Sequence, residues 1–359
     1  MVAGVVVGAA LARPVVDLIG VRDSTFAPLI GILVLVGMGS LGSSVGFVIG
    51  EPIRRRILAA PRSVQLDNTG GALISIVAVV AVGWFLGLSL SRIPNPIVAT
   101  AIQRSLILRH LDGFAPRPPG FLAGVEQVIA GAPFPSVFSG LEPIFQPPLA
   151  LPASVDTPGV TKAAGETLEV RSTGVYCNGI VTGSAYPVAP GYAVTNAHVV
   201  AGTRDTAVIQ GNTVHRATVV LFDPERDVAV LDVQGLRLQP LGDGNPARGT
   251  QGAVIGYPEG GPEQVAPAVV DQQVSAEGRD IYNQNLVVRQ ILVVGSTVKP
   301  GNSGGPLVDL QGNVLGMVFA ASTSDPNRAY ALTDGEIAPD LQAGVGRTAA
   351  VSTGDQCAV

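Results

Sequence analysis

Three separate segments of this chain contain the residue types that serine-based acyl transfer requires. Ser303 lies in the run Lys-Pro-Gly-Asn-Ser-Gly-Gly-Pro, and His198 lies in the run Thr-Asn-Ala-His-Val-Val. A serine hydroxyl is a poor nucleophile at neutral pH and needs a histidine to accept its proton. Asp227, in the run Arg-Asp-Val-Ala-Val-Leu, offers a carboxylate that can orient the imidazole. The segments therefore predict a catalytic triad of His198, Asp227 and Ser303.

The serine run also contains the hydrogen-bond donors that acyl transfer needs. Gly301 and Ser303 can direct two backbone N–H groups toward one point, because glycine permits the tight turn involved. Donors placed in this way stabilise the oxyanion of the tetrahedral intermediate. We expect an oxyanion hole formed by Gly301 and Ser303, with the Asn302 amide turned to support them.

Each of these segments has a plainer explanation when it is considered alone. An Asn-Ser-Gly-Gly run is often only a turn between strands, a single histidine often only packs in a core, and Asp227 can simply begin a buried strand. His110 and His215 lie in no comparable setting, and Asp232, at the far end of the same strand, is the alternative carboxylate. The agreement of three segments favours the triad that contains Asp227.

The sequence around these residues has the pattern of a β protein. From about residue 168 onward, short valine-rich runs alternate with Gly, Pro, Asn and Asp. Frequent turns of this kind are typical of an all-β barrel or sandwich rather than of a parallel sheet. The expected strands cover residues 192–195, 206–209, 218–222, 228–233, 254–257, 286–294 and 314–319.

The order and surroundings of His198, Asp227 and Ser303 resemble those of the chymotrypsin-like serine proteases, most closely the branch of the bacterial HtrA enzymes. The resemblance implies an all-β double six-stranded barrel (chymotrypsin-like) as a trypsin-like serine protease domain over residues 166–359. His198 and Asp227 would come from the first barrel and Ser303 from the second. Too few residues follow Pro339 for the PDZ domain of standard HtrA enzymes.

The same resemblance implies a primary substrate pocket. Thr297 would lie at its base, and Phe319, Ala320 and Ala321 would lie along its wall. None of these residues is charged. A small or medium apolar substrate side chain is therefore expected there, rather than Arg or Lys.

The first ninety residues differ in composition from the remainder. The chain has 359 residues, a formal net charge of −5 and only 14% charged residues, and its mean hydropathy is +0.41. The apolar excess is concentrated in stretches at about 2–19, 27–50 and 72–90, which predict three membrane spans. Buried core helices are the alternative, or a signal peptide for the first stretch. Residues 1–91 are thus expected to form an α-helical transmembrane domain.

Charge predicts how such a domain is oriented. Residues 51–71, between the second and third predicted spans, include Arg54, Arg55, Arg56 and Arg62. Arginine-rich loops face the cytoplasm in multi-pass membrane proteins. The third span then exits outward and places the protease domain on the extracytoplasmic (periplasmic) side of the cell membrane. The lipid bilayer and protein or peptide substrates of the cell envelope are the expected partners.

Residues 92–165 are expected to connect the two domains. Residues 97–111 have helical periodicity, and prolines are dense between residues 116 and 158. Such a segment predicts a helix followed by a mostly extended proline-rich spacer. The proline-poor stretch 159–169 is a candidate site of proteolytic release.

The chain contains two cysteines, Cys177 and Cys357. An even pair in an extracytoplasmic domain suggests a disulfide, and two unrelated free thiols are the alternative. The bridge would attach the C-terminal tail to the first barrel, near the strand that leads to His198.

The chain as a whole resembles the membrane-anchored, acid-resistance periplasmic serine proteases of the MarP type. The resemblance rests on the predicted spans, the proline-rich tether, the cysteine pair and the GNSGG protease without a PDZ domain. The membrane part resembles the colicin-V-production-protein domain, which usually has four spans, so either one span is absent here or the start is assigned too late. The resemblance implies cleavage of envelope proteins in acid or oxidative stress.

Two other functions are compatible with the sequence. The barrels can act as a catalytically idle peptide-binding or chaperone-like scaffold, or the protease can regulate a membrane accessory protein. We recognise no metal-ligand cluster, no phosphate-binding glycine loop and no basic nucleic-acid face. No metal, cofactor or nucleic-acid partner is therefore expected, and the sequence does not indicate the oligomeric state.

Overall fold

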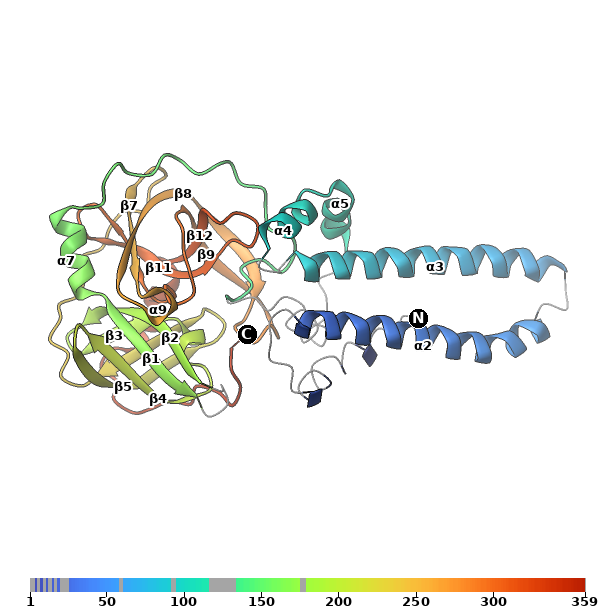
Figure 1. Cartoon of the computed structure of the whole chain (residues 1–359), viewed down its shortest axis with the longest axis horizontal. Coiled ribbons are helices and arrows are strands. Elements are labelled where there is room, and N and C mark those ends of the chain that lie inside the picture. The colour runs from blue at the N-terminus through green and yellow to red at the C-terminus, as the bar shows by residue number, and fades with distance from the viewer. Residues whose placement is uncertain are drawn as a thin grey trace. The chain divides into compact units, whose positions relative to one another are not determined.

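The computed structural model describes most of the chain. Apart from isolated positions before residue 20, the described residues are 26–57, 61–91, 95–115, 134–174 and 179–358. They divide into two compact units, Met1–Ala132 with Gly140–Glu142, and Pro133–Ser139 with Pro143–Val359 (Figure 1).

The N-terminal unit contains two long helices, α2 (Phe26–Ile57) and α3 (Pro61–Leu90). Among the described residues, one stretch, Thr69–Leu90 of α3, is long and apolar enough to cross a membrane, with a mean hydropathy of 2.5 over its most apolar window. The predicted span at 27–50 lies within α2, and the predicted span at 2–19 falls largely outside the described residues.

Two short helices follow, α4 (Pro96–Gln103) and α5 (Leu106–Phe114). The single helix predicted over residues 97–111 is therefore wrong. The helix divides because Ser105 adopts an extended conformation and its hydroxyl accepts the Leu108 N–H at 3.4 Å, so it begins a new helix. A serine at this position competes with the helical backbone for the same donors.

The first barrel of the C-terminal unit consists of six antiparallel strands. In spatial order, they are β1 (Leu168–Gly174), β2 (Ile180–Ala189), β3 (Tyr192–Thr195), β6 (Val228–Val233), β5 (Thr213–Asp223) and β4 (Thr203–Gln210), and β4 pairs again with β1. Alternate inward side chains, among them Leu168, Val208 and Leu231, form its core. A single helical turn, α8 (Ala197–Val200), leaves the end of β3.

The second barrel is also closed and antiparallel. Its spatial order is β10 (Pro306–Asp309), β11 (Val314–Ala321), β12 (Arg328–Thr333), β9 (Leu286–Gly295), β8 (Gln264–Arg279) and β7 (Gln251–Gly256). Val254, Leu292 and Leu307 lie in its core. The unit thus has the double six-stranded barrel that the sequence predicts, and the strands expected over 192–195 and 228–233 match β3 and β6 residue for residue.

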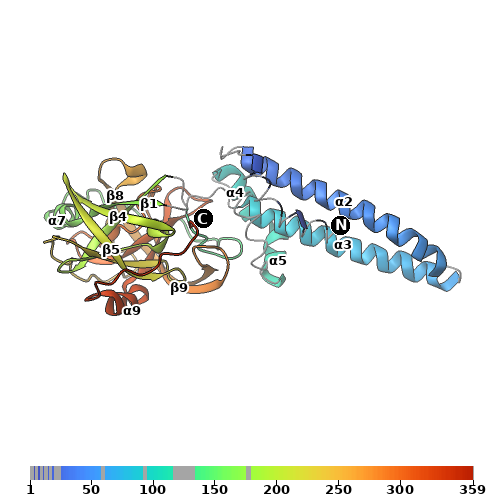
Figure 2. The ribbon, with the colours of Figure 1, turned by 90° about the horizontal axis from the view of Figure 1, so that it is seen from below.

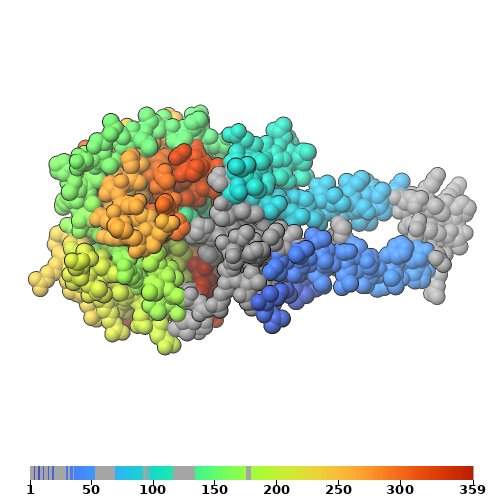
Figure 3. Space-filling view, in the orientation of Figure 1, coloured from blue at the N-terminus to red at the C-terminus, as the bar shows by residue number. Residues whose placement is uncertain are grey.

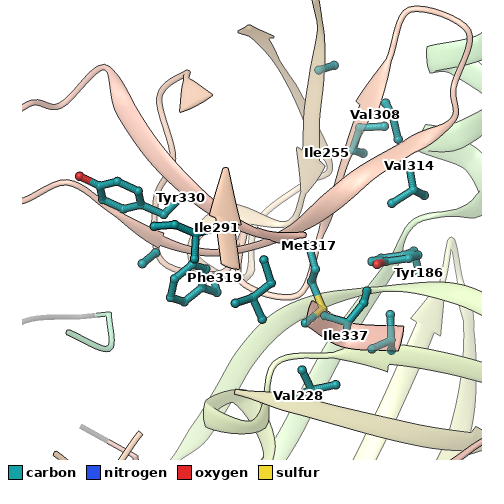
Figure 4. Close-up of a cluster of buried hydrophobic side chains, with 14 of the residues drawn as sticks. Tyr186, Val228, Ile255, Ile291, Val308, Val314, Met317, Phe319, Tyr330 and Ile337 are labelled. Atoms are coloured by element: carbon teal, nitrogen blue, oxygen red, sulfur yellow. The ribbon is translucent and has the colours of Figure 1, made fainter. Parts of the chain in front are cut away.

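Helix α9 (Asp334–Gly344) contacts both barrels and lies at the side of the unit in Figure 2. Ile337 of α9 and Met317 of β11 belong to one buried cluster with Tyr186 and Val228 of the first barrel (Figure 4). Gly344 packs so closely on Val230 that a Cβ atom would lie 2.8 Å from its side chain. The two barrels therefore share a core and are held as one body.

The proline-rich segment over residues 143–157, here termed the belt, is extended and packs on the second barrel. The Phe145 ring lies 6.4 Å from that of Tyr330, and the Leu149 N–H donates to Asp271 Oδ1 at 2.9 Å. The belt and helix α7 (Pro158–Glu166), drawn in green, cover one side of this barrel in Figure 3. The second half of the predicted linker is thus part of the protease unit.

The stretch proposed for proteolytic release, residues 159–169, is not an exposed loop. It forms most of α7 and the start of β1. Val160 and Ala163 of this helix are buried, and the Thr157 hydroxyl both caps the helix and donates to the Leu310 carbonyl at 2.7 Å. Cleavage here would require local unfolding, so the prediction of an accessible site is wrong.

Candidate active site

His198 and Asp227 meet because their strands are neighbours. β3 pairs with β6, with Thr195 opposite Ala229, so the residues just after β3 lie beside the residue just before β6. His198 Nδ1 lies 2.8 Å from Asp227 Oδ2 and 3.0 Å from Oδ1. The His198 backbone N–H also donates to Oδ1 at 2.9 Å. One ring nitrogen is therefore held by the carboxylate and the other is directed elsewhere.

Asp227 is completely buried and has a φ of 66°. A non-glycine residue in the left-handed region is uncommon and costs about 1 kcal/mol or more of backbone strain. Its carbonyl accepts the Asn196 side-chain N–H at 2.9 Å, which helps to hold this conformation. Asp232, the alternative carboxylate, pairs with Tyr192 at the other end of β6 and not with His198.

The segment before Ser303 is a tight turn that depends on glycine and asparagine. Gly301 has a φ of 96°, and a Cβ atom there would overlap the Tyr257 carbonyl oxygen. The Asn302 N–H donates to the Lys299 carbonyl, and the Lys299 N–H donates to Asn302 Oδ1, both at 3.0 Å. Asn302 therefore closes the turn with its backbone and its side chain together.

The orientation of the Gly301 amide follows from its peptide partner. The Pro300 carbonyl accepts the Glu259 N–H, with an N···O distance of 2.6 Å. In a trans peptide the C=O and N–H point in opposite directions, so the Gly301 N–H points away from Glu259. Within the described part of the chain, neither the Gly301 N–H nor the Ser303 N–H has an acceptor. Both remain available for a substrate oxygen.

Ser184, on β2, connects this turn to the first barrel and was not identified from the sequence. It is completely buried. Its N–H donates to the Ser303 carbonyl at 2.7 Å, its hydroxyl donates to the Gly301 carbonyl at 2.7 Å, and the same hydroxyl accepts the Tyr257 N–H at 3.0 Å. One serine thus orients both residues of the predicted oxyanion hole. A serine in a strand gives no sequence signal for such a role, because its partners lie more than seventy residues away.

Ser303 is held close to the helix that carries His198. Gly304 packs so tightly on Ser184 and Thr195 that a Cβ atom there would overlap both. Among the described residues, the Ser303 hydroxyl has no hydrogen bond to His198 within 3.5 Å. Catalytic hydrogen bonds are often long in ligand-free enzymes and shorten when substrate binds.

The predicted pocket residues differ in how far they are exposed to solvent. Phe319 and Ala320 are buried and Ala321 is half-buried, whereas Thr297 is exposed. β11 pairs with β10 only as far as Met317, while Ala320 and Ala321 pair with β12 on the other side. The strand edge from Phe319 to Ala321 is therefore not covered by β10.

The predicted disulfide partners cannot both be placed, because Cys177 lies outside the described residues. Cys357, which is described, has no free thiol. The tail before it is attached next to α8: the Gly202 N–H donates to the Thr353 carbonyl, and the Thr353 hydroxyl donates to the Thr203 carbonyl, both at 2.9 Å. The C-terminal tail thus contacts the segment that directly follows the His198 helix.

Comparison with known proteins agrees with this geometry. The family described as trypsin-like peptidase domain matches residues 177–317. Serine protease Rv3671c of Mycobacterium tuberculosis is 33% identical over 318 residues, covering 85% of this chain and 78% of that protein. A probable periplasmic serine endoprotease, DegP-like, of Pseudomonas putida is 36% identical over 131 residues, covering 35% of this chain and 26% of that protein.

Solved structures show the same similarity. The crystal structure of the Rv3671c protease from M. tuberculosis in its active form superimposes with a TM-score of 0.58 at 36% identity, covering 61% of this chain and 99% of that one. The inactive form of the same protease gives a TM-score of 0.51 at 34% identity, covering 56% and 100%.

Proposed function

This chain belongs to the family of trypsin-like serine proteases that includes Rv3671c of M. tuberculosis, and from that premise we propose that it is a membrane-anchored endopeptidase of the cell envelope. It is a serine endopeptidase by its relatives and its domain. The observation that carries the assignment of the active site is the 2.8 Å contact between His198 and the buried Asp227, beside a Ser303 turn with two unpaired N–H groups.

The proposed reaction uses the three side chains in sequence. Ser303 Oγ attacks the scissile carbonyl carbon while His198 Nε2 accepts its proton, and His198 then donates that proton to the leaving amine. Water, activated by His198, releases the acyl group in the second half-reaction. Asp227 holds the imidazole by Nδ1 and stabilises the imidazolium that forms.

The Gly301 and Ser303 N–H groups are the proposed donors to the oxyanion. Donors that are already oriented need no rearrangement as charge develops, so they stabilise the transition state more than the substrate. Asn302 supports the hole by closing the turn through Lys299, rather than by donating to the oxyanion. Its role is therefore to keep Gly301 in its left-handed conformation.

Substrates are proposed to bind in extended form along the free edge of β11. An added peptide strand gains main-chain hydrogen bonds to an open edge, here the edge from Phe319 to Ala321. Its preferred side chain before the scissile bond is small or medium and apolar, because these wall residues carry no charge. The exposed Thr297 is a weaker candidate for the base of the pocket.

Membrane anchoring is proposed from the N-terminal unit. The stretch Thr69–Leu90 is long enough, at 22 residues, to cross a hydrocarbon core of about 30 Å. We also propose additional spans at about 2–19 and 27–50, which would make a multi-pass domain like that of colicin-V-production proteins; the apolar stretches support them. The arginines of residues 51–71 support an extracytoplasmic protease. Several relatives are described as periplasmic.

We also propose a Cys177–Cys357 disulfide and a role in acid or oxidative stress. The disulfide is supported by the bonded state of Cys357 and by the attachment of the tail beside α8. A bridge at this position would limit the motion of the segment that follows His198. Cleavage of envelope proteins under stress is consistent with the periplasmic relatives.

The endopeptidase activity can be tested with the full chain in detergent micelles and fluorescently labelled, unfolded casein. We expect the wild type to cleave casein. The Ser303→Ala, His198→Ala and Asp227→Ala variants should each cleave it at less than about 10⁻³ of the wild-type rate. Cleavage that persists in Ser303→Ala would contradict the assignment. Proteinase K added to intact spheroplasts should digest the C-terminal unit; protection of that unit would contradict the proposed orientation.

A further inference from the structure

A buried arginine lies between the loop that carries Asp227 and the second barrel. Arg289, on β9, is 2% exposed. Arginine remains charged in proteins and is rarely buried without compensation. The residue has no part in the proposed chemistry, and so its buried charge requires an explanation.

The guanidinium bridges two structural elements. Its Nε donates to the Glu225 carbonyl at 2.8 Å, two residues before Asp227, and its Nη2 donates to the Arg279 carbonyl of β8 at 2.9 Å. The same loop is also attached by the Ile281 N–H, which donates to the Pro224 carbonyl at 3.1 Å. The position of the first-barrel loop is therefore set by donors of the second barrel.

The guanidinium also lies over the side chain proposed to line the substrate pocket. Its central carbon is 6.0 Å from the centre of the Phe319 ring, within the range of a cation–π contact. Because the Phe319 side chain is completely buried, this contact ties Arg289 to the core of the second barrel.

The charge of Arg289 is balanced at longer range. Among the described residues, no carboxylate lies within 4.0 Å of the guanidinium. Burial lowers the pKa of Arg289, and nearby carboxylates oppose that shift; in decreasing order of effect they are Asp227, Glu336, Asp280 and Asp223. Asp227 is therefore the carboxylate whose charge acts most strongly on Arg289.

We propose that Arg289 is a positioning residue for the His198–Asp227 pair: its two carbonyl bonds hold the Asp227 loop against the second barrel. This inference rests on the proposed triad. The inference adds to that triad a supporting residue that takes no part in the proposed reaction steps.

The chain offers a matched control in Arg328 of β12. That arginine is also buried, its Nη2 donates to the Gln146 carbonyl at 2.8 Å, and its guanidinium lies 5.1 Å from the centre of the Phe145 ring. It holds the belt rather than the Asp227 loop. Unlike Arg289, it also pairs with Asp325 at 3.4 Å and with Asp271 at 3.7 Å. Arg328→Gln therefore removes another buried cation, together with these ion pairs, without touching the proposed triad.

The test measures the second-order rate constant of fluorophosphonate labelling of the full chain in detergent, from pH 5 to pH 9. Arg289→Gln removes the charge and the bonds. We expect its labelling to be about 10–100-fold slower, as for the loss of hydrogen bonds from a charged group. The loss should be similar across this pH range, because it comes from the displaced Asp227 loop.

Two further variants separate geometry from charge. Arg289→Lys keeps the charge but cannot bridge both carbonyls, so it should label several-fold more slowly. Arg328→Gln should lower thermal stability and leave the labelling rate within about threefold of the wild type. If Arg289→Gln does not fold, Arg289→Lys carries the test, and a wild-type labelling rate for it overturns the proposal.

The outcomes distinguish this inference from the proposed function. A wild-type chain without Ser303-dependent labelling overturns the triad itself, and the role of Arg289 with it. An active wild type whose folded Arg289→Gln variant labels within about threefold of it overturns only the role of Arg289. A labelling rate that falls equally in Arg328→Gln does so as well.

Discussion

The turn that carries Ser303 and the loop that carries Asp227 are held in place by different kinds of interaction. Residues 299–304 are fixed by uncharged groups: the Ser184 hydroxyl, the Asn302 side chain and the Glu259 backbone N–H. Among the described residues they have one ion pair, between Lys299 and Glu259 at 3.6 Å, which is largely exposed and contributes little to stability.

Charges dominate around residues 223–227. Arg226 lies 3.0 Å from Asp223, 3.5 Å from Glu336 and 3.8 Å from Asp340, and the buried Arg289 donates to the backbone of the same loop. The proposed nucleophile and oxyanion donors are thus positioned by shape and neutral hydrogen bonds, whereas the proposed acid–base pair is positioned by charge. We infer that pH and salt act on the enzyme mainly through the second loop, and substitutions of small residues mainly through the first.

The comparison predicts its largest effect at Gly301. In Gly301→Ala the new Cβ overlaps the Tyr257 carbonyl oxygen, so the oxyanion donor must turn away. We expect kcat for casein to fall about 10²–10³-fold, as for the loss of one oxyanion donor, with little change in KM. Gly346→Ala is the control, because Gly346 also has a positive φ, of 90°, but no atom within 4 Å of a new Cβ. Equal losses in both variants would show that strain alone matters.

A smaller effect is expected from Ser184→Ala. The substitution leaves the Gly301 carbonyl and the Tyr257 N–H without their buried partner, at a cost of about 1–3 kcal/mol. We expect kcat to fall roughly 10–100-fold while the pH profile keeps its shape. Ser172→Ala is the matched control, since Ser172 is an equally buried strand serine whose hydroxyl contacts only Thr206 among the described residues. A shifted pH profile in Ser184→Ala would contradict the separation of the two loops.

The smallest expected effect is a change in thermal stability, and it comes from a charged residue, Asp334. Burial, and then the nearby Asp243, raise the pKa of Asp334 to about 6. A carboxyl whose folded-state pKa exceeds its unfolded value stabilises the fold fully at low pH, and this contribution disappears as pH rises through about 6. Asp334→Asn should therefore raise the melting temperature at pH 7.5 by about 2–4 °C, with no gain at pH 4.

The measurement is scanning calorimetry of the full chain in detergent at both pH values. Asp205→Asn, at an exposed position of β4, is the control and should change neither melting temperature by more than a degree or so. A loss of stability at pH 7.5 in Asp334→Asn would show that the negative charge at the start of α9 outweighs its burial.

The sequence predicts the β architecture well because its signals are local, and the proposed triad rests on signals of the same kind. His198, Asp227 and Ser303 each occur in a short run whose glycine, alanine or valine neighbours reflect the backbone needed there. β3 and β6 are short, largely apolar runs of the right length. The break between α4 and α5 escaped prediction because one capping serine outweighed an otherwise helical pattern.

The supporting residues could not be predicted in this way. Ser184 and Arg289 act through carbonyl groups far away in the sequence, and their residue types also occur in unremarkable strands. Dense proline predicts that the belt is an extended spacer, but it does not predict what that chain packs against. The contact of the belt with the buried Arg328 depends on the second barrel. The exposure of Thr297 likewise depends on loops that local pattern does not determine.

The most direct test of the account is site-specific labelling of the intact chain with a fluorophosphonate probe, followed by peptide mass mapping. We predict one adduct, on Ser303, which is absent from Ser303→Ala and at least about 10³-fold slower in His198→Ala. Labelling of another residue, or none in a folded wild-type chain, would contradict the claim that Ser303 and the His198–Asp227 pair form the active site.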